Sequence, residues 1–407
     1  MKFIHAADLH LDSPFRGLQD LPASLLTQIR ESTFTAATKV FDRALAEQVD
    51  FVLLAGDLFD RAEQSVAAQA YLIEQFDRLA QAKIPVILGF GNHDYLADQH
   101  LSIAYPDNVT VLGPQVTTTT LTLQDGTTVA ISGFSYDQRW VDRDPLGDFP
   151  VHAATDWHLG MLHGAVATGS GDHYAPFTVA ELLAKRYDYW ALGHIHQRQR
   201  LNENPPVLYA GNTQGRDRTE TGDRGAYLVT NQDHRLVPEF FSTAALVWTN
   251  PTLALTTPNP TLAEIGDCLT TWLSREPAMT PELVVPTLSL NGALSAAEQA
   301  QITSGDWLAL FQRTQRRVMQ AVKRVVVALR WDSPVGTTAA PQLDTRYWSV
   351  GADQVFTPEN LQEQFGKLAQ EPALADWFAD PKTAVTLREE ATKLLAALAG
   401  EEDDHAS

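Results

Sequence analysis

Side chains that bind metal ions recur in five short clusters along the first half of this sequence. The clusters are Asp8-x-His10, Gly56-Asp57-Leu58-Phe59-Asp60, Gly91-Asn92-His93-Asp94, Leu162-His163-Gly164 and Gly193-His194-Ile195-His196. Seven of their side chains, two carboxylates, one amide oxygen and four imidazoles, form a mixture that suits divalent and transition-metal ions. Two ions about 3.5–4 Å apart need a shared ligand, and the Asp57 carboxylate is the natural bridge. The sequence therefore predicts a dinuclear centre that hydrolyses phosphate esters. Its predicted ligands are Asp8, His10, Asp57, Asn92, His163, His194 and His196.

A strand and helix alternation is predicted to position these clusters. Residues 2–7, 51–55, 84–88 and 187–192 are short apolar runs, whereas 22–48 and 64–82 have helical apolar spacing. In such α/β sheets, ligands gather just outside the carboxyl ends of the strands. Several of the clusters directly follow a predicted strand, so we expect them to meet at one edge. Between 109 and 135 the pattern changes to hairpins around an Asp125-Gly126 turn, which predicts a second sheet.

Composition shifts predict three regions. Residues 243–263 are rich in proline and threonine, and we place the end of the first domain, 1–245, at this point. Within a second domain, 246–340, we expect a strand near 283–290, a helix over 295–321 and a strand near 322–331, which make a small α+β unit. The third region, 341–407, is predicted to be helical over 357–399 and to end in an acidic tail.

The charge balance restricts the function. With 30 basic and 50 acidic residues the net charge is −20, which argues against a general nucleic-acid coat. Bound cations would neutralise some of this acidity, and the segment 301–350 carries seven basic and three acidic residues. The single cysteine, Cys268, fits a reducing compartment. Without an apolar stretch long enough to span a bilayer, we expect a cytoplasmic protein with no membrane contact.

The ordered motifs resemble the calcineurin-like metallophosphoesterases, whose pattern D-x-H, GD-x-x-D, GNHD, H and GH-x-H is matched over about residues 1–240. Further stretches are similar to bacterial DNA repair exonucleases of the SbcD/YhaO type. These stretches are GDLFDR at 56–61, LHGAVATGSGDHYAPFT at 162–178 and AGNTQGRDRTETGDRGAYLV at 210–229. The resemblance implies a four-layer α/β-sandwich domain, followed by a small α+β capping domain that guides DNA and a helical C-terminal tail. It also implies two metal ions, with manganese as the physiological metal.

The resemblance also assigns roles to the site residues. It implies that Asp8, His10, Asp57 and His196 hold one ion, and that Asp57, Asn92, His163 and His194 hold the other. His93 follows a ligand without being needed as one, and it is placed to give a proton to the phosphoryl or leaving oxygen, a role that the family supports. Asp60 and Asp94 are interpreted as residues that orient imidazoles or close the loops. The remaining histidines considered are interpreted as structural, and they are His5, His100, His152, His158 and His173.

Several arginines are candidate phosphate or DNA contacts. Arg61 follows the second cluster, and Arg216 and Arg218 lie in a turn-rich loop, although loop arginines are more often only solvated. A stretch without acidic residues carries further cations that either contact duplex DNA or form an ordinary exposed helix face. These cations are Arg313, Arg316, Arg317, Lys323, Arg324 and Arg330.

The family resemblance implies partners as well. It suggests DNA, an SMC-like coiled-coil ATPase of the YhaN kind bound through the C-terminal helices, and a homodimer. The apolar positions over 358–399 are compatible with such docking, and they would equally complete the protein's own fold. The prediction is a metal-dependent DNA exonuclease. Two alternatives stay open: a phosphodiesterase or phosphatase for small nucleotides, and a non-catalytic docking component of an ATPase complex.

Overall fold

A computed structural model describes residues 1–13, 15, 21, 23–60, 64–96, 104–167, 173–332, 351–366, 377–378, 383–388 and 391. The chain divides into two compact units. The first comprises Met1–Leu255, Thr261–Ser289 and Ser295–Trp331. The second combines Thr256–Pro260 and Leu290–Leu294 with the described residues from Asp332 onward. The predicted domain boundary near 245 stays a prediction, and the one at 340 lies outside the described residues.

Two six-stranded sheets form the centre of the first unit. The first sheet is ordered β12 (Arg235–Ser242), β11 (Gly225–Gln232), β1 (Lys2–Ala6), β2 (Phe51–Ala55), β3 (Val86–Gly89) and β4 (Val109–Val111). The second is ordered β5 (Thr117–Thr122), β6 (Thr128–Gly133), β7 (Trp157–His163), β8 (Tyr189–Gly193), β10 (Val207–Tyr209) and β9 (Gln199–Asn202). Strands β1 to β4 are mutually parallel, and so are β6, β7, β8 and β10. Parallel central strands bring their carboxyl ends to one edge of each sheet.

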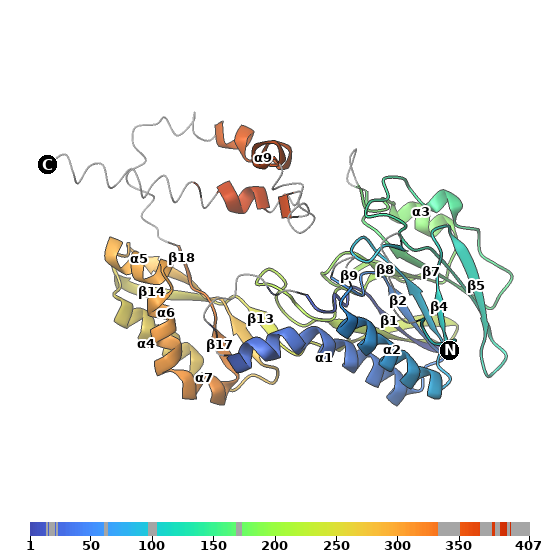
Figure 1. The fold of residues 1–407 in the computed structure, drawn as a ribbon, viewed down its shortest axis with the longest axis horizontal. Coiled ribbons are helices and arrows are strands. Elements are labelled where there is room, and N and C mark those ends of the chain that lie inside the picture. Colours follow the sequence, from blue (N-terminus) through green and yellow to red (C-terminus); the bar gives the residue numbers. More distant parts are fainter. Residues whose placement is uncertain are drawn as a thin grey trace. The chain divides into compact units, whose positions relative to one another are not determined.

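Side-chain alternation along the strands creates the layers. In β2, Val52 and Leu54 pack with α1 (Ala23–Glu47) and α2 (Val66–Gln81), which cover one face of the first sheet (Figure 1). Phe51 and Leu53 point the other way and pack between the two sheets against residues of β6, β7 and β8. The far face of the second sheet packs against α3 (Val179–Ala184) and the segment that contains the short 3₁₀ helix η2 (Leu146–Asp148). The predicted four-layer α/β sandwich is confirmed.

Capping and turn residues explain where several helices and strands of the first unit begin or end. Ser65 caps α2, because its side chain accepts a hydrogen bond from the Ala68 amide. Thr178 and Glu181 form a capping box at the start of α3. The predicted Asp125-Gly126 turn joins antiparallel β5 and β6, and Gly126 has a φ of 88°. The hairpin prediction is therefore confirmed for residues 117–133, whereas β4, in the same predicted region, pairs with β3 in the first sheet.

The region after β12 differs from its prediction in detail. It contains two three-stranded sheets and the helices α4 (Leu262–Leu273), α5 (Ala296–Thr303), α6 (Asp306–Thr314) and α7 (Arg316–Val322). The sheets are β13 (Val247–Thr249), β15 (Glu282–Val284), β17 (Arg324–Val326), and β14 (Thr252–Pro258), β16 (Thr287–Asn291), β18 (Arg330–Asp332).

Two predicted elements in this region are wrong as single elements. The helix expected over 295–321 is broken into three, because Gly305 adopts a left-handed φ of 85° and Gln315 leaves the helical conformation. The strand expected over 283–290 is divided between two sheets around Pro286, which has no amide hydrogen for a sheet ladder. The strand expected near 322–331 is likewise divided into β17 and β18.

A C-terminal helix is present at the beginning of the segment that was predicted to be helical. Thr357 accepts a hydrogen bond from the Asn360 amide, and Pro358 begins α9 (Pro358–Phe365). Leu361 and Phe378 belong to a small apolar cluster of this unit. Residues 383–388 are also helical, whereas most of the rest of the predicted 357–399 segment lies outside the described residues. None of the described helices is both long enough and apolar enough to span a bilayer.

Candidate metal centre

The predicted ligands lie at the carboxyl ends of five strands. Asp8, Asp57 and Asn92 lie shortly beyond β1, β2 and β3 of the first sheet. His163 is the last residue of β7, and His194 follows β8 in the second sheet. The two stacked sheets therefore contribute ligands to one place, as the order of the clusters in the sequence predicted.

Backbone hydrogen bonds join the first two loops. The Asp8 amide donates to the Gly56 carbonyl at 3.0 Å, and the His10 amide donates to the Asp57 carbonyl at 3.0 Å. Asp8, His10, Asp57 and His194 all have positive φ angles, which are uncommon for residues other than glycine. Strained backbone of this kind persists where the surrounding structure holds it, and it concentrates at functional sites.

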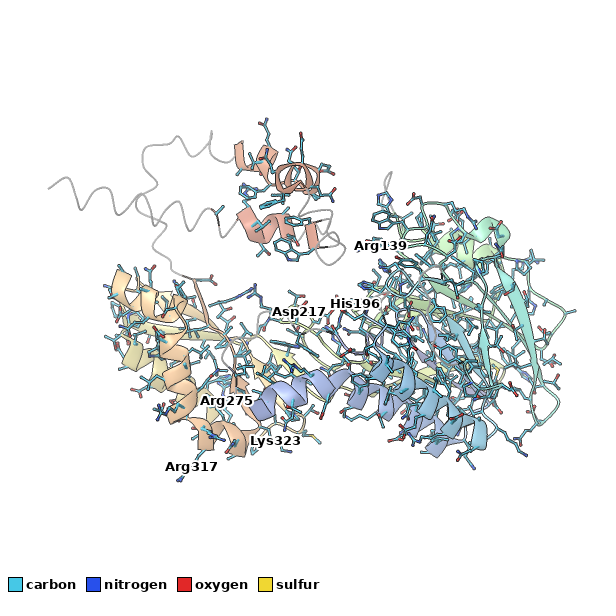
Figure 2. All side chains as sticks on the ribbon, viewed as in Figure 1. Arg139, His196, Asp217, Arg275, Arg317 and Lys323 are labelled. Carbon is cyan, nitrogen blue, oxygen red and sulfur yellow. The ribbon has the colours of Figure 1, made fainter. Side chains whose placement is uncertain are left out.

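The first cluster of ligands contains Asp8, His10 and His196, whose ligand atoms all lie within 4.8 Å of one another. The Nε2 atoms of His10 and His196 are only 3.0 Å apart. Asp8 and His10 are fully buried, and His196 lies in the loop between β8 and β9, where Figure 2 labels it. Two imidazole nitrogens so close together, beside a buried carboxylate, fit a shared cation.

The second cluster contains Asp57, His163 and His194, again within 4.8 Å. His163 Nε2 lies 3.3 Å from Asp57 Oδ2 and 3.1 Å from Asn92 Oδ1. His194 Nδ1 also lies 3.1 Å from Asn92 Oδ1. Asp57 Oδ2 is in turn 3.8 Å from His10 Nε2 of the first cluster. The Asp57 carboxylate thus lies between the clusters, as a bridging ligand must.

Two glycines leave the space that this second cluster occupies. A Cβ atom on Gly91 would lie 2.2 Å from Asp57 Oδ1 and 2.6 Å from His163 Nε2. A Cβ atom on Gly56, which has a φ of 90°, would lie 2.3 Å from His163 Nδ1. Both positions therefore require glycine if the ligands are to keep their places.

The electrostatics of the cluster are those of a cation site. Burial opposes ionisation of Asp57, but the neighbouring imidazoles, His163 first, outweigh it and hold the pKa of Asp57 well below its usual range. Burial also disfavours a charged His163, yet Asp57 and Asp8 raise the pKa of His163 to about 9. Burial lowers the pKa of His194 well below its usual value. A buried ionised carboxylate that stabilises positive charge on a neighbouring imidazole would stabilise a divalent metal ion in the same place, with release of the imidazole proton.

His93 and Asp60 lie beside the first cluster. His93 Nδ1 is 2.8 Å from the Asp60 carbonyl oxygen, so Nδ1 carries the hydrogen, and the His93 ring packs edge-on against the His10 ring. The ligand atoms of His10, Asp60 and His93 also lie within 4.8 Å of one another. Asp60 Oδ1 is 3.5 Å from His10 Nδ1 and accepts a hydrogen bond from Ser13. This placement is compatible with the predicted role of Asp60 in orienting an imidazole.

Asp94 closes two ligand loops. Its Oδ2 accepts a hydrogen bond from the Leu58 amide at 2.6 Å, and its Oδ1 accepts one from the Gly91 amide at 2.7 Å. Asp94 is fully buried, and this burial raises its pKa to about 7. The carboxylate therefore fastens the loop after β2 to the loop after β3.

The predicted arginines are distributed unevenly. The Arg216 guanidinium forms an ion pair with Asp60 beside the first cluster, whereas Arg218 is exposed and Arg61 lies outside the described residues. Arg313, Arg316 and Arg317 are exposed on α6 and α7, and Figure 2 labels Arg317.

Arg324, one of the cations in this stretch, makes its contacts within the fold. Arg324 pairs with Glu282 at 2.9 Å and donates to the Glu276 carbonyl at 2.7 Å. Arg324 is therefore already paired within the fold, and DNA contact by the other cations of this stretch stays a prediction.

Glu220 is a residue that sequence reasoning missed. Its Oε1 lies 2.6 Å from His196 Nδ1, and its side chain is only 10% exposed. The neighbouring imidazole and guanidinium outweigh its burial and hold the pKa of Glu220 well below its usual range. Glu220 lies in the 210–229 stretch that carried the resemblance, but nothing in that acidic and polar loop distinguished it from its neighbours Asp217 and Asp223.

Among the histidines interpreted as structural, His5 is fully buried and contacts the Tyr189 hydroxyl and the Leu192 carbonyl. His158 is 2.8 Å from Ser132 Oγ, and His152 pairs with Asp188 at 3.0 Å. His173 pairs with Asp142 at 2.7 Å in an exposed loop. His100 lies outside the described residues.

Comparison with known proteins supports the family. Residues 1–198 match the model of the calcineurin-like phosphoesterase family. An uncharacterized metallophosphoesterase, YhaO of Bacillus subtilis, is 44% identical over 251 residues, which cover 61% of this chain and 62% of that protein. The DNA double-strand break repair protein Mre11 of Methanocaldococcus jannaschii is 28% identical, with coverage of 56% and 62%. A component of the nuclease SbcCD of Escherichia coli K12 is 24% identical, with coverage of 52% and 60%.

The matches thus extend over about three fifths of the length of each of these relatives. The matched residues 1–198 contain all seven predicted ligands and His93. The amino-terminal part of this chain is therefore a calcineurin-like metallophosphoesterase domain.

Proposed function

We propose that this protein is a manganese-dependent DNA exonuclease that acts in DNA repair. The observation that carries the proposal is the pair of ligand clusters with Asp57 between them and His93 alongside. This arrangement brings together the side chains that would hold two metal ions and one that would donate a proton.

Seven residues would hold the two ions. Asp8, His10, Asp57 and His196 would hold one, and Asp57, Asn92, His163 and His194 the other. The carboxylate and amide oxygens of this set suit manganese, and no thiolate is present among the seven to favour a softer metal. When bound, such a pair polarises the phosphate and lowers the pKa of a bound water, which supplies the attacking hydroxide.

His93 would serve as the proton donor. Because its Nδ1 hydrogen is directed to the Asp60 carbonyl, the opposite nitrogen, Nε2, is the one that can exchange a proton with substrate. Its ring is only half-buried, so a substrate oxygen has access to it. Donation of a proton to the leaving oxygen would assist cleavage.

The choice of DNA as substrate has two kinds of support. Two of the similar proteins are named as a DNA double-strand break repair protein and as a component of a nuclease. The exposed cations Arg313, Arg316 and Arg317 are suited to contact DNA phosphates outside the metal centre. We further propose that residues 246–340 act as a domain that guides DNA.

The proposed partner is an SMC-like coiled-coil ATPase that binds the C-terminal region, residues 341–407. Exposed apolar side chains in the described part of that region support the proposal, and they include Val355, Phe365, Trp377 and Val385. A homodimer is also proposed. The double variant Val355→Glu and Val385→Glu should abolish co-purification with the ATPase while the metal content stays unchanged. Continued co-purification would contradict docking through this region.

The first test is degradation of end-labelled duplex and single-stranded DNA by the purified chain with manganese, in parallel with hydrolysis of a small chromogenic phosphodiester. His93→Ala should keep both metal ions and lose most DNA cleavage. His234→Asn is the matched control, because His234 lies in the exposed turn between β11 and β12. Cleavage that survives in His93→Ala, or loss of its manganese, would contradict the assigned role of His93.

Cleavage of the small ester alone requires a second measurement, in which the ATPase partner and ATP are added to the DNA assay. DNA degradation that appears under these conditions would support a nuclease that depends on its partner. Its continued absence would contradict the nuclease proposal and favour a phosphodiesterase for small nucleotides.

A further inference from the structure

Glu220 makes a specific contact with one candidate ligand. Its Oε1 is 2.6 Å from His196 Nδ1, so the Nδ1 hydrogen is donated to the carboxylate and His196 Nε2 keeps its lone pair. That Nε2 is the atom that lies 3.0 Å from His10 Nε2. A carboxylate that accepts from the far nitrogen of a ligating imidazole fixes both its tautomer and its ring orientation, and it makes the imidazole a better ligand.

The other carboxylate oxygen is held separately. Oε2 accepts hydrogen bonds from the Asn212 side chain and the Arg216 amide, both at 2.7 Å. The Glu220 side chain is consequently held by the Asn212 side chain and a backbone amide in addition to the imidazole, and the Arg216 guanidinium lies beside it, 3.2 Å from His196 Nδ1. Its position is determined before any ion binds.

The same loop, residues 212–224, also holds the backbone of His196. The His196 carbonyl accepts from the Asn212 amide at 3.1 Å and from Arg224 Nη1 at 2.6 Å. Ring and main chain are thus both anchored by one segment. This segment lies beyond residues 1–198, the part of the chain that matches the family model.

Hydrogen bonds also connect the 212–224 loop to β13 and to the residue before it, Leu246. Trp248 Nε1 donates to the Gly215 carbonyl at 3.1 Å, and the Gly222 amide donates to the Trp248 carbonyl at 3.1 Å. A buried Gln214 side chain donates to the Leu246 carbonyl at 2.7 Å. These bonds restrict the loop, and so they restrict the carboxylate that faces His196.

We propose that Glu220 is a positioning residue that orients His196 and thereby sets the occupancy of the ion position formed by Asp8, His10 and His196. The ion position formed by Asp57, Asn92, His163 and His194 has no contact with Glu220 among the described residues, so it should be independent of Glu220. This inference rests on the proposed dinuclear centre. It does not require that the substrate be DNA.

The test is titration of the metal-free full-length chain with Mn²⁺, followed by calorimetry and by electron paramagnetic resonance. The wild-type chain should bind two ions and give the spectrum of a coupled pair. Glu220→Gln keeps the size of the side chain and an acceptor oxygen but removes the charge, and it should weaken one of the two binding steps by about 10–100-fold. Glu220→Ala should lose that step and give the spectrum of an isolated Mn²⁺ ion.

Two variants separate positioning from loop integrity. Asn212→Ala removes a hydrogen bond from Oε2 and leaves the Oε1 contact with His196, so it should keep both ions. Glu203→Gln changes an exposed glutamate that pairs with Arg200, and it should behave as the wild type. Metal-free thermal melts of all variants report whether they are folded.

The outcomes are distinct. Two unchanged binding steps in Glu220→Gln, or equal losses in Asn212→Ala and Glu220→Ala, would overturn the positioning role. Loss of both ions in folded Glu220→Gln would overturn the selectivity for one position. A wild-type chain that binds fewer than two Mn²⁺ ions would instead contradict the dinuclear centre itself. If Glu220→Ala does not fold, the Glu220→Gln titration still decides the question.

Discussion

At the scale of single residues, Asp57 connects the two ligand clusters. Its Oδ2 lies 3.3 Å from His163 Nε2 and 3.8 Å from His10 Nε2, while its Oδ1 accepts from the His93 amide at 3.0 Å. Asp8, of the first cluster, reaches the second through the backbone amide of His194, whereas the Asp57 carboxylate lies near imidazole nitrogens of both clusters. Its backbone φ of 50° is a conformation that asparagine adopts readily, so a neutral replacement need not disturb the fold.

Asp57→Asn should therefore lose both ions and the activity together. The substitution removes the charge of the proposed bridging carboxylate. Metal catalysis supplies several kcal/mol of transition-state stabilisation, so phosphodiester hydrolysis should fall by at least about 10³-fold. Metal analysis after gel filtration measures the first effect and a chromogenic ester the second. Asp125→Asn, in the exposed β5–β6 turn, is the control. Two retained ions in Asp57→Asn would contradict the bridging assignment.

His5 is a second residue with a measurable consequence. It is fully buried, with Nδ1 2.9 Å from the Tyr189 hydroxyl and Nε2 3.2 Å from the Leu192 carbonyl. Burial lowers the pKa of His5 from 6.5 to about 3, so the folded protein keeps this imidazole neutral. Below pH 6.5 the unfolded chain takes up a proton that the native state excludes. The stabilising effect is therefore complete above pH 6.5 and is lost as the pH falls toward 3.

At pH 4.5 this effect should reduce the free energy of unfolding by about 3 kcal/mol relative to pH 7. His5→Gln has no titrating group, so its stability should fall less over the same interval. Urea unfolding of the metal-free wild type and variant at both pH values measures the difference. Equal pH dependence in the two chains would show that His5 does not titrate as its burial requires.

At the scale of elements, the loops at the strand ends depend on two glycines. The loop after β3 passes so close to the second cluster that a Cβ atom on Gly91 would collide with Asp57 Oδ1 and His163 Nε2. The loop after β2 is restricted in the same way at Gly56. Asp94 then ties the two loops together through the Leu58 and Gly91 amides. The ligands are therefore placed by close approach of backbone as well as by the strands.

Gly91→Ala should displace a ligand of the second cluster without unfolding the domain. We expect Mn²⁺ affinity to fall by at least about tenfold, because even partners of metal ligands have effects of this size. Gly113→Ala is a matched control, since a Cβ atom there would meet nothing within 4 Å. Calorimetric Mn²⁺ titration and thermal melts measure both variants. Equal Mn²⁺ affinity in the two would mean that the loop relaxes around the added methyl group.

At the scale of the whole molecule, a chain with a net charge of −20 is proposed to bind DNA. Binding would then depend on local cations and on the charge of the bound ions. Arg316 and Arg317 are exposed at the start of α7, and Lys323, labelled in Figure 2, is exposed at its end. Arg324 is excluded from this surface because it pairs with Glu282.

The double variant Arg316→Gln and Arg317→Gln should weaken DNA affinity and flatten its salt dependence. If each arginine neutralises one phosphate, the slope of log K against log salt concentration should fall by about 1.8. Fluorescence anisotropy over a salt series measures the slope. Lys83→Gln with Arg235→Gln removes two exposed cations elsewhere and serves as the control. An unchanged slope would identify Arg316 and Arg317 as ordinary surface residues, and hydrolysis of a small ester should be unaffected in either case.

The chemistry of the site could be read from the sequence because it resides in short motifs. Asp8-x-His10, the GNHD cluster and Gly193-His194-Ile195-His196 each bring ligands together within a few residues, and each follows an apolar run that becomes a buried strand. The apolar runs predict buried strands, and their alternation with helical segments predicts parallel strands. The sandwich and the grouping of the ligands were predictable for this reason.

Contacts between distant residues were not predictable in the same way. Glu220 reaches His196 across 24 positions of sequence, and Arg216 reaches Asp60 across 156. Among the many charged residues of those loops, no local pattern distinguishes the ones that become buried partners. The breaks at Gly305 and Pro286 were visible in the sequence, but the assignment of β15 and β16 to different sheets depends on packing between distant strands. The sequence by itself determined which side chains are available to bind metal ions. The tertiary structure decided which carboxylates hold these side chains in place. The hydrogen bonds and ion pairs between them form only when the packed sheets bring separate loops together.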